Sequence, residues 1–281
     1  MRAPADQRAR PFAGIVVLGI YSAAGVVLLG TATSRIRYSA DHDRTIGLWE
    51  VWIPVAAAIL VARLVPPRLP RHEPEAADRP RREAWQCVAI AIAFALALPI
   101  LGTPPPDGWY VALKLGLIAI VPSFVLTHRA WLTGFPQQHG YRHWWWTGPA
   151  AATAAWLGLA WLGPYARPST SNATIVTLIA AFVLNAVLEE RFYRGWLQTR
   201  LEHVFGRWTA IGTASLLWAA WHLALHTTDR PLVDAAAVVA HLGVLGLLLG
   251  YLWSRYRNPW ALLAVHGATN APLDLVQTAW P

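Results

Sequence analysis

The chain has 281 residues, of which 56% are hydrophobic and 14% are charged, whereas an average globular chain has about 25% charged residues. Together with 17 tryptophans, this composition indicates a polytopic membrane protein. The net charge of +8 does not indicate a nucleic-acid partner, because the arginines lie between apolar segments and form no single basic run. The one cysteine, Cys87, excludes an internal disulfide and a cysteine-cluster zinc site, and we interpret it as a packing residue.

A membrane-spanning helix needs about 20 mostly apolar residues. Nine segments approach this criterion, and they predict an all-α polytopic helix bundle with eight to nine spans. In chain order the segments are 12–33, 47–65, 85–102, 109–127, 148–164, 174–197, 209–226, 233–253 and 259–277. Pro272 is expected to bend or end the last of them.

The arginines predict the orientation of the bundle, because cytoplasmic loops are enriched in positive charge. With the N-terminus in the cytoplasm, seventeen arginines lie in inner segments and five in outer segments. The charged, Pro-rich segment 66–84 is then a cytoplasmic loop that separates a two-helix N-terminal region, 1–84, from a membrane-embedded core, 85–281. The preference for arginine and alanine over lysine is typical of a GC-rich bacterial genome, so we expect an integral protein of the bacterial inner (cell) membrane.

Two adjacent carboxylates, Glu189 and Glu190, interrupt the apolar segment 174–197. Charged groups at membrane depth are costly and are usually paired and functional. Glu190 and Arg194 are four residues apart on one helix face, which predicts an ion pair. Glu189 points about 100° away from Glu190 and is not neutralised by that pair, so it is suited to be a general base. The alternative is a helix end at the cytoplasmic surface, where both acids are solvated.

Two later helices carry further polar residues. His222 lies in segment 209–226, and His266 and Asn270 share a helix face in segment 259–277. Each alone is typical of a hydrogen-bonded helix contact. Together, Glu189, His222 and His266 make a carboxylate-plus-two-histidine set that suits a catalytic zinc ion with an open position, and equally a metal-free base with histidine helpers. The sequence assigns no role to Lys114, the only lysine, which lies within a helix.

These elements, in this order, resemble the CPBP family of intramembrane proteases, which includes the CAAX prenyl endopeptidases and proteins linked to bacteriocin self-protection. The family pattern is Glu-Glu-x-x-x-Arg, Phe-x-x-x-His and His-x-x-x-Asn/Asp on successive core helices. The first and third elements are matched by Glu189, Glu190, Arg194, His266 and Asn270. The second is matched at His222, but Trp218 stands where the family usually has Phe, a change expected to alter only the shape of the substrate cavity. The resemblance covers residues 148–277.

The resemblance implies hydrolysis of a peptide bond inside the membrane. The implied roles are water activation by Glu189, shaping of the site by Glu190 with Arg194, binding of the water or a metal by His222 and His266, and oxyanion stabilisation by Asn270. Family members include both glutamate-dependent proteases and metalloproteases. If a metal is present, we expect Zn²⁺ held by Glu189, His222 and His266. The implied partners are membrane lipid and a membrane-associated protein or peptide substrate, with no nucleic acid.

Two other functions remain open from the sequence. One is a non-catalytic membrane scaffold or bacteriocin-immunity factor on the same fold. The other is a proton- or metal-coupled transporter, which would need inverted repeats that are not visible in the sequence.

The predicted helix ends conflict with a shared site. They place Glu189 and His222 about 10 Å apart in depth, at ~1.5 Å per residue, which is too far to share one water. We therefore expect the helix at 174–197 to extend past Arg200, and the next helix to begin later, near Gly212.

Overall fold

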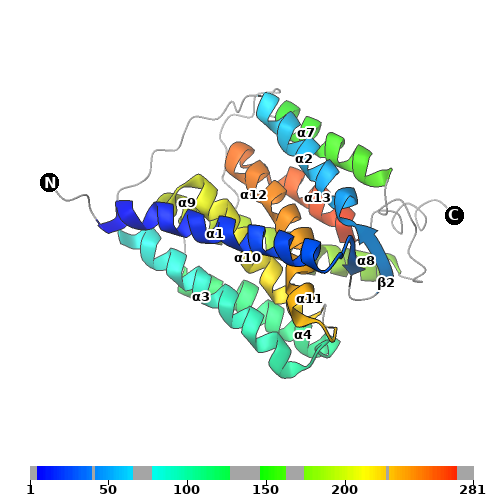
Figure 1. Ribbon diagram of the computed structural model, residues 1–281. Helices are drawn as coiled ribbons and strands as arrows, with labels where there is room; N and C mark the ends of the chain where they lie inside the picture. Colours follow the sequence, from blue (N-terminus) through cyan, green and yellow to red (C-terminus); the bar gives the residue numbers. More distant parts are fainter. Residues whose placement is uncertain are drawn as a thin grey trace.

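The computed structural model describes residues 5–39, 42–65, 78–126, 146–162, 174–225 and 228–270. These residues form a bundle of helices with one short β-hairpin (Figure 1). The elements of the N-terminal half are α1 (Ala5–Gly30), β1 (Arg35–Ser39), β2 (His42–Gly47), α2 (Leu48–Leu64), α3 (Asp78–Leu101), α4 (Asp107–Lys114), the π-helical η1 (Leu115–Ile120) and α5 (Val121–Val125). Those of the C-terminal half are α7 (Thr147–Trp161), α8 (Ile175–Ala181), the π-helical η4 (Phe182–Val187) and η5 (Glu190–Gln198), α9 (Thr199–Phe205), α10 (Arg207–Trp221), the 3₁₀-helical η6 (His222–Ala224), α11 (Pro231–Val238), the π-helical η7 (Val239–Gly243), α12 (Val244–Tyr256) and α13 (Pro259–Asn270).

The helices have the lengths and surfaces of a membrane protein. Within the described ranges, four helical segments are long and apolar enough to cross a membrane: Ala13–Gly30, Arg81–Leu101, Asp107–Val125 and Pro231–Tyr256. Large apolar side chains such as Leu29, Ile100 and Phe124 are exposed on such segments, as expected for surfaces that face lipid. The chain is therefore an integral membrane protein built mainly of α-helices. The eight to nine spans and the cytoplasmic N-terminus stay predictions.

A helix lies at each of the nine predicted segments, but the connection between the first two was not predicted correctly. The strands β1 and β2 pair in an antiparallel hairpin, in which Ile36 pairs with Ile46 and Arg37 with Thr45. Ile36 and Ile46 are buried against Val51 of α2, which explains why this short segment is ordered. The prediction of an all-α membrane protein therefore agrees with the bundle, and the short hairpin in this connection is a feature that the sequence did not indicate.

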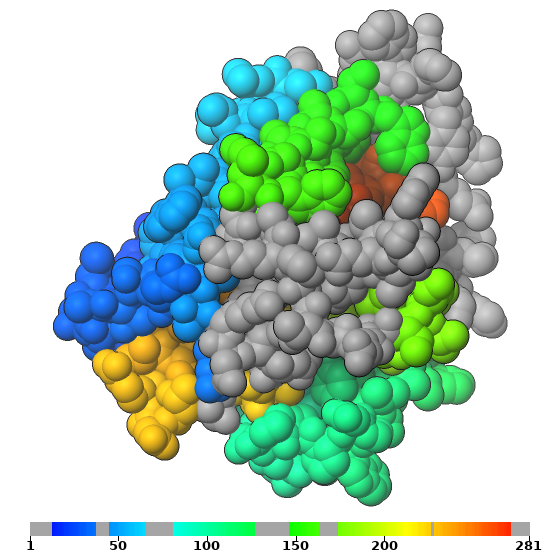
Figure 2. Space-filling view, turned by 90° about the vertical axis from the view of Figure 1, so that its right-hand side faces the viewer, coloured from blue at the N-terminus to red at the C-terminus, as the bar shows by residue number. Residues whose placement is uncertain are grey.

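Helix α10 lies at the centre of the bundle and packs against α1, α3, α9 and α12. Small residues permit the close approach of α10 and α12, because a Cβ at Gly246 would lie only 2.9 Å from the Cβ of Ser215. Helix α1 also packs against α11, and α2 packs against α7 and α12. Helix α13 lies beside α7, as the face in Figure 2 shows.

The two N-terminal helices thus pack directly on C-terminal ones. The division at residue 84 stays a prediction, and residues 66–77 of the connector lie outside the described residues. Cys87 is buried in the apolar core, in agreement with a packing role.

The helix that carries the acidic pair is continuous from Ile175 to Phe205, so it extends past Arg200 as expected. The expected late start of the next helix is wrong, because α10 begins at Arg207 directly after Gly206. Gly206 has a φ of 81°, a conformation that favours glycine and lets the chain turn sharply between the two helices. Two π-helical segments, η4 and η5, flank Glu189, and such widened turns are frequent at functional sites.

Candidate functional site

Glu189 forms a buried ion pair with Lys114, the last residue of α4. The Lys114 ammonium donates to Glu189 Oε1, and both side chains are almost fully buried. It also donates to Asn185 Oδ1 at 2.7 Å and to the Tyr110 hydroxyl at 2.6 Å. The prediction that Glu189 lacks a full counter-charge is therefore wrong. Its partner lies 75 residues earlier in the chain, and helix periodicity relates only residues of one helix.

The second carboxylate oxygen of Glu189 is bound as well. The indole N–H of Trp218, in α10, donates to Glu189 Oε2 at 2.5 Å. From the sequence alone, Trp218 is a replacement of one aromatic residue by another. Phenylalanine has no such donor, so the replacement adds a hydrogen bond to the carboxylate. One signal for Lys114 was present in the sequence, since a single lysine within an apolar helix is itself unusual.

Glu190 points away from Glu189, toward α13. Its Oε1 lies 3.3 Å from the guanidinium nitrogen Nη1 of Arg194, so the ion pair predicted from their spacing is present. The same oxygen accepts a hydrogen bond of 2.7 Å from Nδ1 of His266. All three side chains are buried. The Arg194 guanidinium also lies 4.7 Å from the centre of the Trp218 ring, so Trp218 contacts both halves of the cluster.

His266 connects the two acids. Because its Nδ1 donates to Glu190, its Nε2 is left as the acceptor when the imidazole is neutral. This Nε2 lies 3.9 Å from Glu189 Oε2. The separation is too long for a direct hydrogen bond and is compatible with one water bonded to both atoms.

His222 joins the cluster through ring contacts. It lies in η6, at the end of α10, where its Nδ1 is 3.0 Å from the carbonyl oxygen of Trp218. Its ring stacks on Trp221 with centroids 3.6 Å apart, and the Trp221 ring in turn lies 4.8 Å from the Lys114 ammonium. The sequence predicted that His222 and Glu189 lie at different depths. In the structure it is Trp218, one turn before His222, that contacts Glu189 directly.

Asn270 is the predicted site residue that has no contact with the cluster in the described structure. It is exposed at the last residue of α13, one turn beyond His266. The side-chain hydroxyl of the neighbouring Thr269 donates to the His266 carbonyl at 2.6 Å. The role of Asn270 in oxyanion stabilisation stays a prediction.

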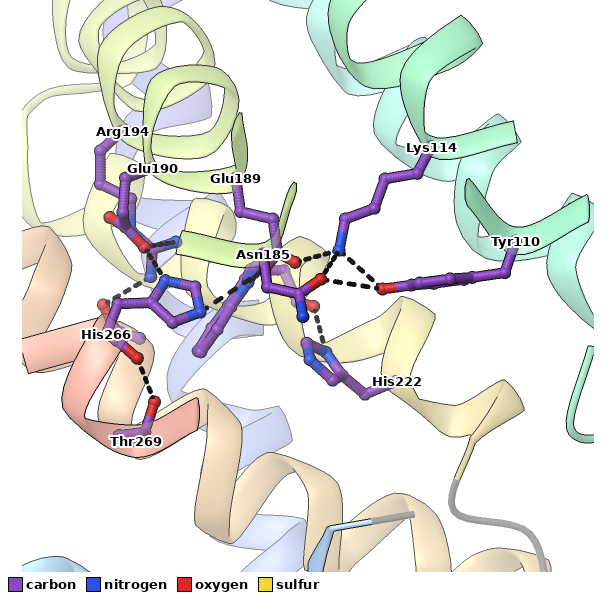
Figure 3. A network of polar contacts seen from close by, with 11 residues as sticks. Tyr110, Lys114, Asn185, Glu189, Glu190, Arg194, His222, His266 and Thr269 are labelled. Carbon is purple, nitrogen blue, oxygen red and sulfur yellow. Dashed lines mark hydrogen bonds and ion pairs between the residues drawn. The ribbon is translucent and has the colours of Figure 1, made fainter. Parts of the chain in front are cut away.

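The residues of the cluster lie on two sides of Glu189 (Figure 3), a buried, closed side and a partly exposed, more open side. Glu190, Arg194 and His266 lie on one side of Glu189 and are buried. Tyr110, Asn185 and His222 lie on the other side and are each partly exposed. A substrate or a water can therefore approach Glu189 most directly from the side of Asn185 and His222.

The three residues predicted to hold zinc do not fit a zinc ion in this arrangement. A cation, the Lys114 ammonium, already contacts Glu189, and a dication at the same carboxylate would be repelled by it. His266 uses Nδ1 for Glu190, and His222 contacts the cluster through Trp218 and Trp221. Among the described residues, no group of three or more His, Cys, Asp or Glu side chains is arranged to hold a metal ion.

A cavity of about 190 Å³ lies elsewhere, between the β-hairpin and α11. Its lining includes Arg35, Arg230 and His241 and shares no residue with the cluster. We assign the candidate site to the cluster because it combines buried carboxylates with histidines, which are groups that can activate a water. The assignment does not rest on the volume of the cavity.

In a comparison with protein families, residues 171–272 match the Rce1-like family, described as type II CAAX prenyl endopeptidases. No curated protein and no solved structure matches the chain. The match includes Glu189, Glu190, Arg194, His222, His266 and Asn270, and it begins 57 residues after Lys114. The resemblance to the CPBP proteases is therefore confirmed by a family match over residues 171–272.

Proposed function

We propose that this chain, whose residues 171–272 match the Rce1-like type II CAAX prenyl endopeptidases, hydrolyses a peptide bond of a membrane-associated protein or peptide. The observation that carries the proposal is the approach of Glu189 Oε2 to His266 Nε2, at 3.9 Å within a buried cluster. Two acceptor atoms at this separation can hold one water between them, and one of them is a carboxylate that can take a proton.

In the proposed reaction, the water donates one proton to Glu189 and directs its other hydrogen to His266 Nε2. Its oxygen then attacks the substrate carbonyl carbon and forms a tetrahedral intermediate. As the bond between carbon and nitrogen breaks, Glu189 returns the proton to the leaving amine nitrogen, which balances the reaction. Glu190 and Arg194 act on His266, because Glu190 holds the proton on Nδ1 and so fixes the tautomer that the water requires.

Two further residues complete the proposal from the family pattern. We assign to His222, on the more open side, contact with the water or the substrate, and to Asn270 donation to the oxyanion. The mechanism needs no metal, and the Lys114 ammonium beside Glu189 supports a glutamate-dependent reaction.

The proposed substrate is the C-terminal region of a membrane-associated protein, as the family description suggests. The apolar, exposed helix surfaces support a site that works within lipid. We propose that the protein functions in the bacterial inner membrane, on the basis of the arginine- and alanine-rich composition.

The test is cleavage of a fluorogenic prenylated CAAX peptide by the full chain in lipid vesicles, with an unprenylated peptide beside it. Glu189→Gln should lower the rate by about 10²–10⁴-fold, the usual contribution of a general base. The matched control is Glu202→Gln, because Glu202 lies on the same helix and is ion-paired with Arg257, outside the cluster.

Cleavage by Glu189→Gln at the wild-type rate would contradict the proposal. A comparison of membrane proteomes from wild-type and Glu189→Gln cells then identifies substrates without prior assumptions. If both strains have the same processed proteins and the variant keeps its cellular function, the non-catalytic scaffold or immunity factor becomes the better explanation.

A further inference from the structure

We propose that Lys114 is a positioning residue that keeps Glu189 ionised and directs its carboxylate toward the water site. The inference rests on the proposed function for its kinetic consequences, and on the structure alone for the ion pair. Lys114 lies outside the segment that matches the protease family, so this part of the site is supplied by the N-terminal half of the chain.

The Lys114 ammonium is fully satisfied. An ammonium has three N–H donors, and the structure gives three acceptors: Glu189 Oε1, Asn185 Oδ1 and the Tyr110 hydroxyl. The Tyr110 hydroxyl also donates to Asn185 Oδ1 at 3.4 Å, which fixes the relative positions of these two partners. With all its donors in use, the ammonium has little freedom to leave Glu189.

Aromatic rings enclose the same ammonium. Its nitrogen lies 4.8 Å from the centre of the Trp221 ring and 4.9 Å from that of Tyr110. The faces of such rings attract cations, so they support a charged lysine where its side chain is 0% exposed. Trp221 also stacks on His222, and this contact connects the lysine environment to the more open side of the site.

The two acids consequently have separate cations. Glu190 is balanced by Arg194 and hydrogen-bonded by His266, whereas Glu189 is balanced by Lys114. A buried carboxylate with no counter-charge takes up a proton, and a protonated Glu189 cannot act as a base. Lys114 therefore does for Glu189 what a bound metal ion would do for a carboxylate ligand, and Trp218 fixes the other oxygen of the same group.

Several charged or titratable groups surround Glu189, and each of them can influence the pH dependence of cleavage. From α4 these are Lys114 and Tyr110, from α13 His266 and from η6 His222. On the helix of Glu189 itself they are Glu190, Tyr193 and Arg194. Among the described residues, Lys114 is the one cation that makes a direct ion pair with Glu189 without a histidine proton, so we expect its removal to have the largest effect on the acidic limb.

The first test uses thermal unfolding of the full chain in vesicles and needs no activity. Lys114→Met keeps the length of the side chain and removes its charge, which leaves Glu189 buried and unpaired. We expect Tm to fall by about 5 °C or more, and Lys114→Met combined with Glu189→Gln to recover most of the loss. Equal Tm values for the single and double variants would contradict an energetic coupling between Lys114 and Glu189.

The second test is the pH dependence of peptide cleavage. In Lys114→Met, the acidic limb of the profile should move to higher pH by about one unit or more, with a lower kcat and an unchanged KM. The control is Arg200→Met, which breaks an ion pair with Glu83 at the edge of the bundle and should leave the profile unchanged. A wild-type profile and kcat in Lys114→Met would show that the lysine is only structural.

A milder variant keeps the inference testable if Lys114→Met fails to fold. Tyr110→Phe removes one of the three partners of the ammonium and leaves Glu189 and Lys114 in place. It should shift the acidic limb in the same direction by a smaller amount, and no shift would count against the positioning role. The two proposals fail in different ways: an active Glu189→Gln variant rejects the proposed reaction, whereas a normal Lys114→Met variant rejects only the role of the lysine.

Discussion

Trp218 donates its indole N–H to Glu189 Oε2 over 2.5 Å, from α10 to the helix that carries the two acids. The same ring has its centroid 5.2 Å from that of His266 and another 5.2 Å contact with His222. The residue that departs from the family pattern thus contacts both histidines and Glu189. Its hydrogen bond leaves Glu189 with a donor at each carboxylate oxygen.

Trp218→Phe restores the usual family residue and removes only the donor and part of the ring. A hydrogen bond to a charged group contributes about 1.5–3 kcal/mol, so kcat/KM should fall by about ten- to a hundredfold. Trp253→Phe is the matched control, because its indole donates to Thr199 Oγ1, outside the cluster. If both variants reduce cleavage equally, the effect comes from packing and not from the bond to Glu189.

Arg194→Met should destabilise the protein strongly, because it leaves Glu190 buried without its cation. Removal of one partner from a buried ion pair costs about 3–5 kcal/mol. Arg194→Met combined with Glu190→Gln should recover most of this stability, since glutamine can still accept from His266 Nδ1. Unfolding of the two variants and the wild type in the same vesicles measures the difference, and an equal loss in both would argue against coupling within the pair.

Removal of divalent metal ions should leave cleavage unchanged. In the described arrangement, the carboxylate oxygens of Glu189 have Lys114 and Trp218 as partners. Glu189 therefore needs no metal ion that a chelator could remove. The measurement is the cleavage rate before and after treatment with a zinc chelator, and again after zinc is added back. Activity that is lost and then restored by zinc would show that the family's metal-dependent chemistry applies here and that the cluster rearranges to bind it.

Gly246→Ala should weaken the packing of α12 on α10. The added Cβ would lie 2.9 Å from the Cβ and 3.1 Å from the Cα of Ser215, and backbone atoms cannot move aside cheaply. Overpacking of this kind costs about 1–3 kcal/mol. Gly158→Ala is the control, because Gly158 is an exposed helical glycine with no atom within 4 Å of an added Cβ. Thermal unfolding should show a loss for Gly246→Ala and no loss for Gly158→Ala.

The positions of the helices were largely predictable, because an apolar segment of about 20 residues is a strong local signal. The hairpin of β1 and β2 was not, since the sequence of these two short strands contains five arginine, histidine and aspartate residues beside the buried Ile36 and Ile46. The pairing of Glu190 with Arg194 was predictable because both lie on one helix, four residues apart. The number of spans and their orientation stay predictions of the sequence.

The sequence by itself determined that this is a helical membrane protein with two acids, two histidines and an arginine in a protease-like order. The periodicity of a helix also determined that Glu189 and Glu190 point in different directions. Only the tertiary structure decided what each acid meets: Lys114 and Trp218 for Glu189, and His266 for Glu190. The physical reason is that a sequence pattern fixes the direction of a side chain about its own helix axis. The offset and rotation of one helix against another depend on packing between residues far apart in the chain.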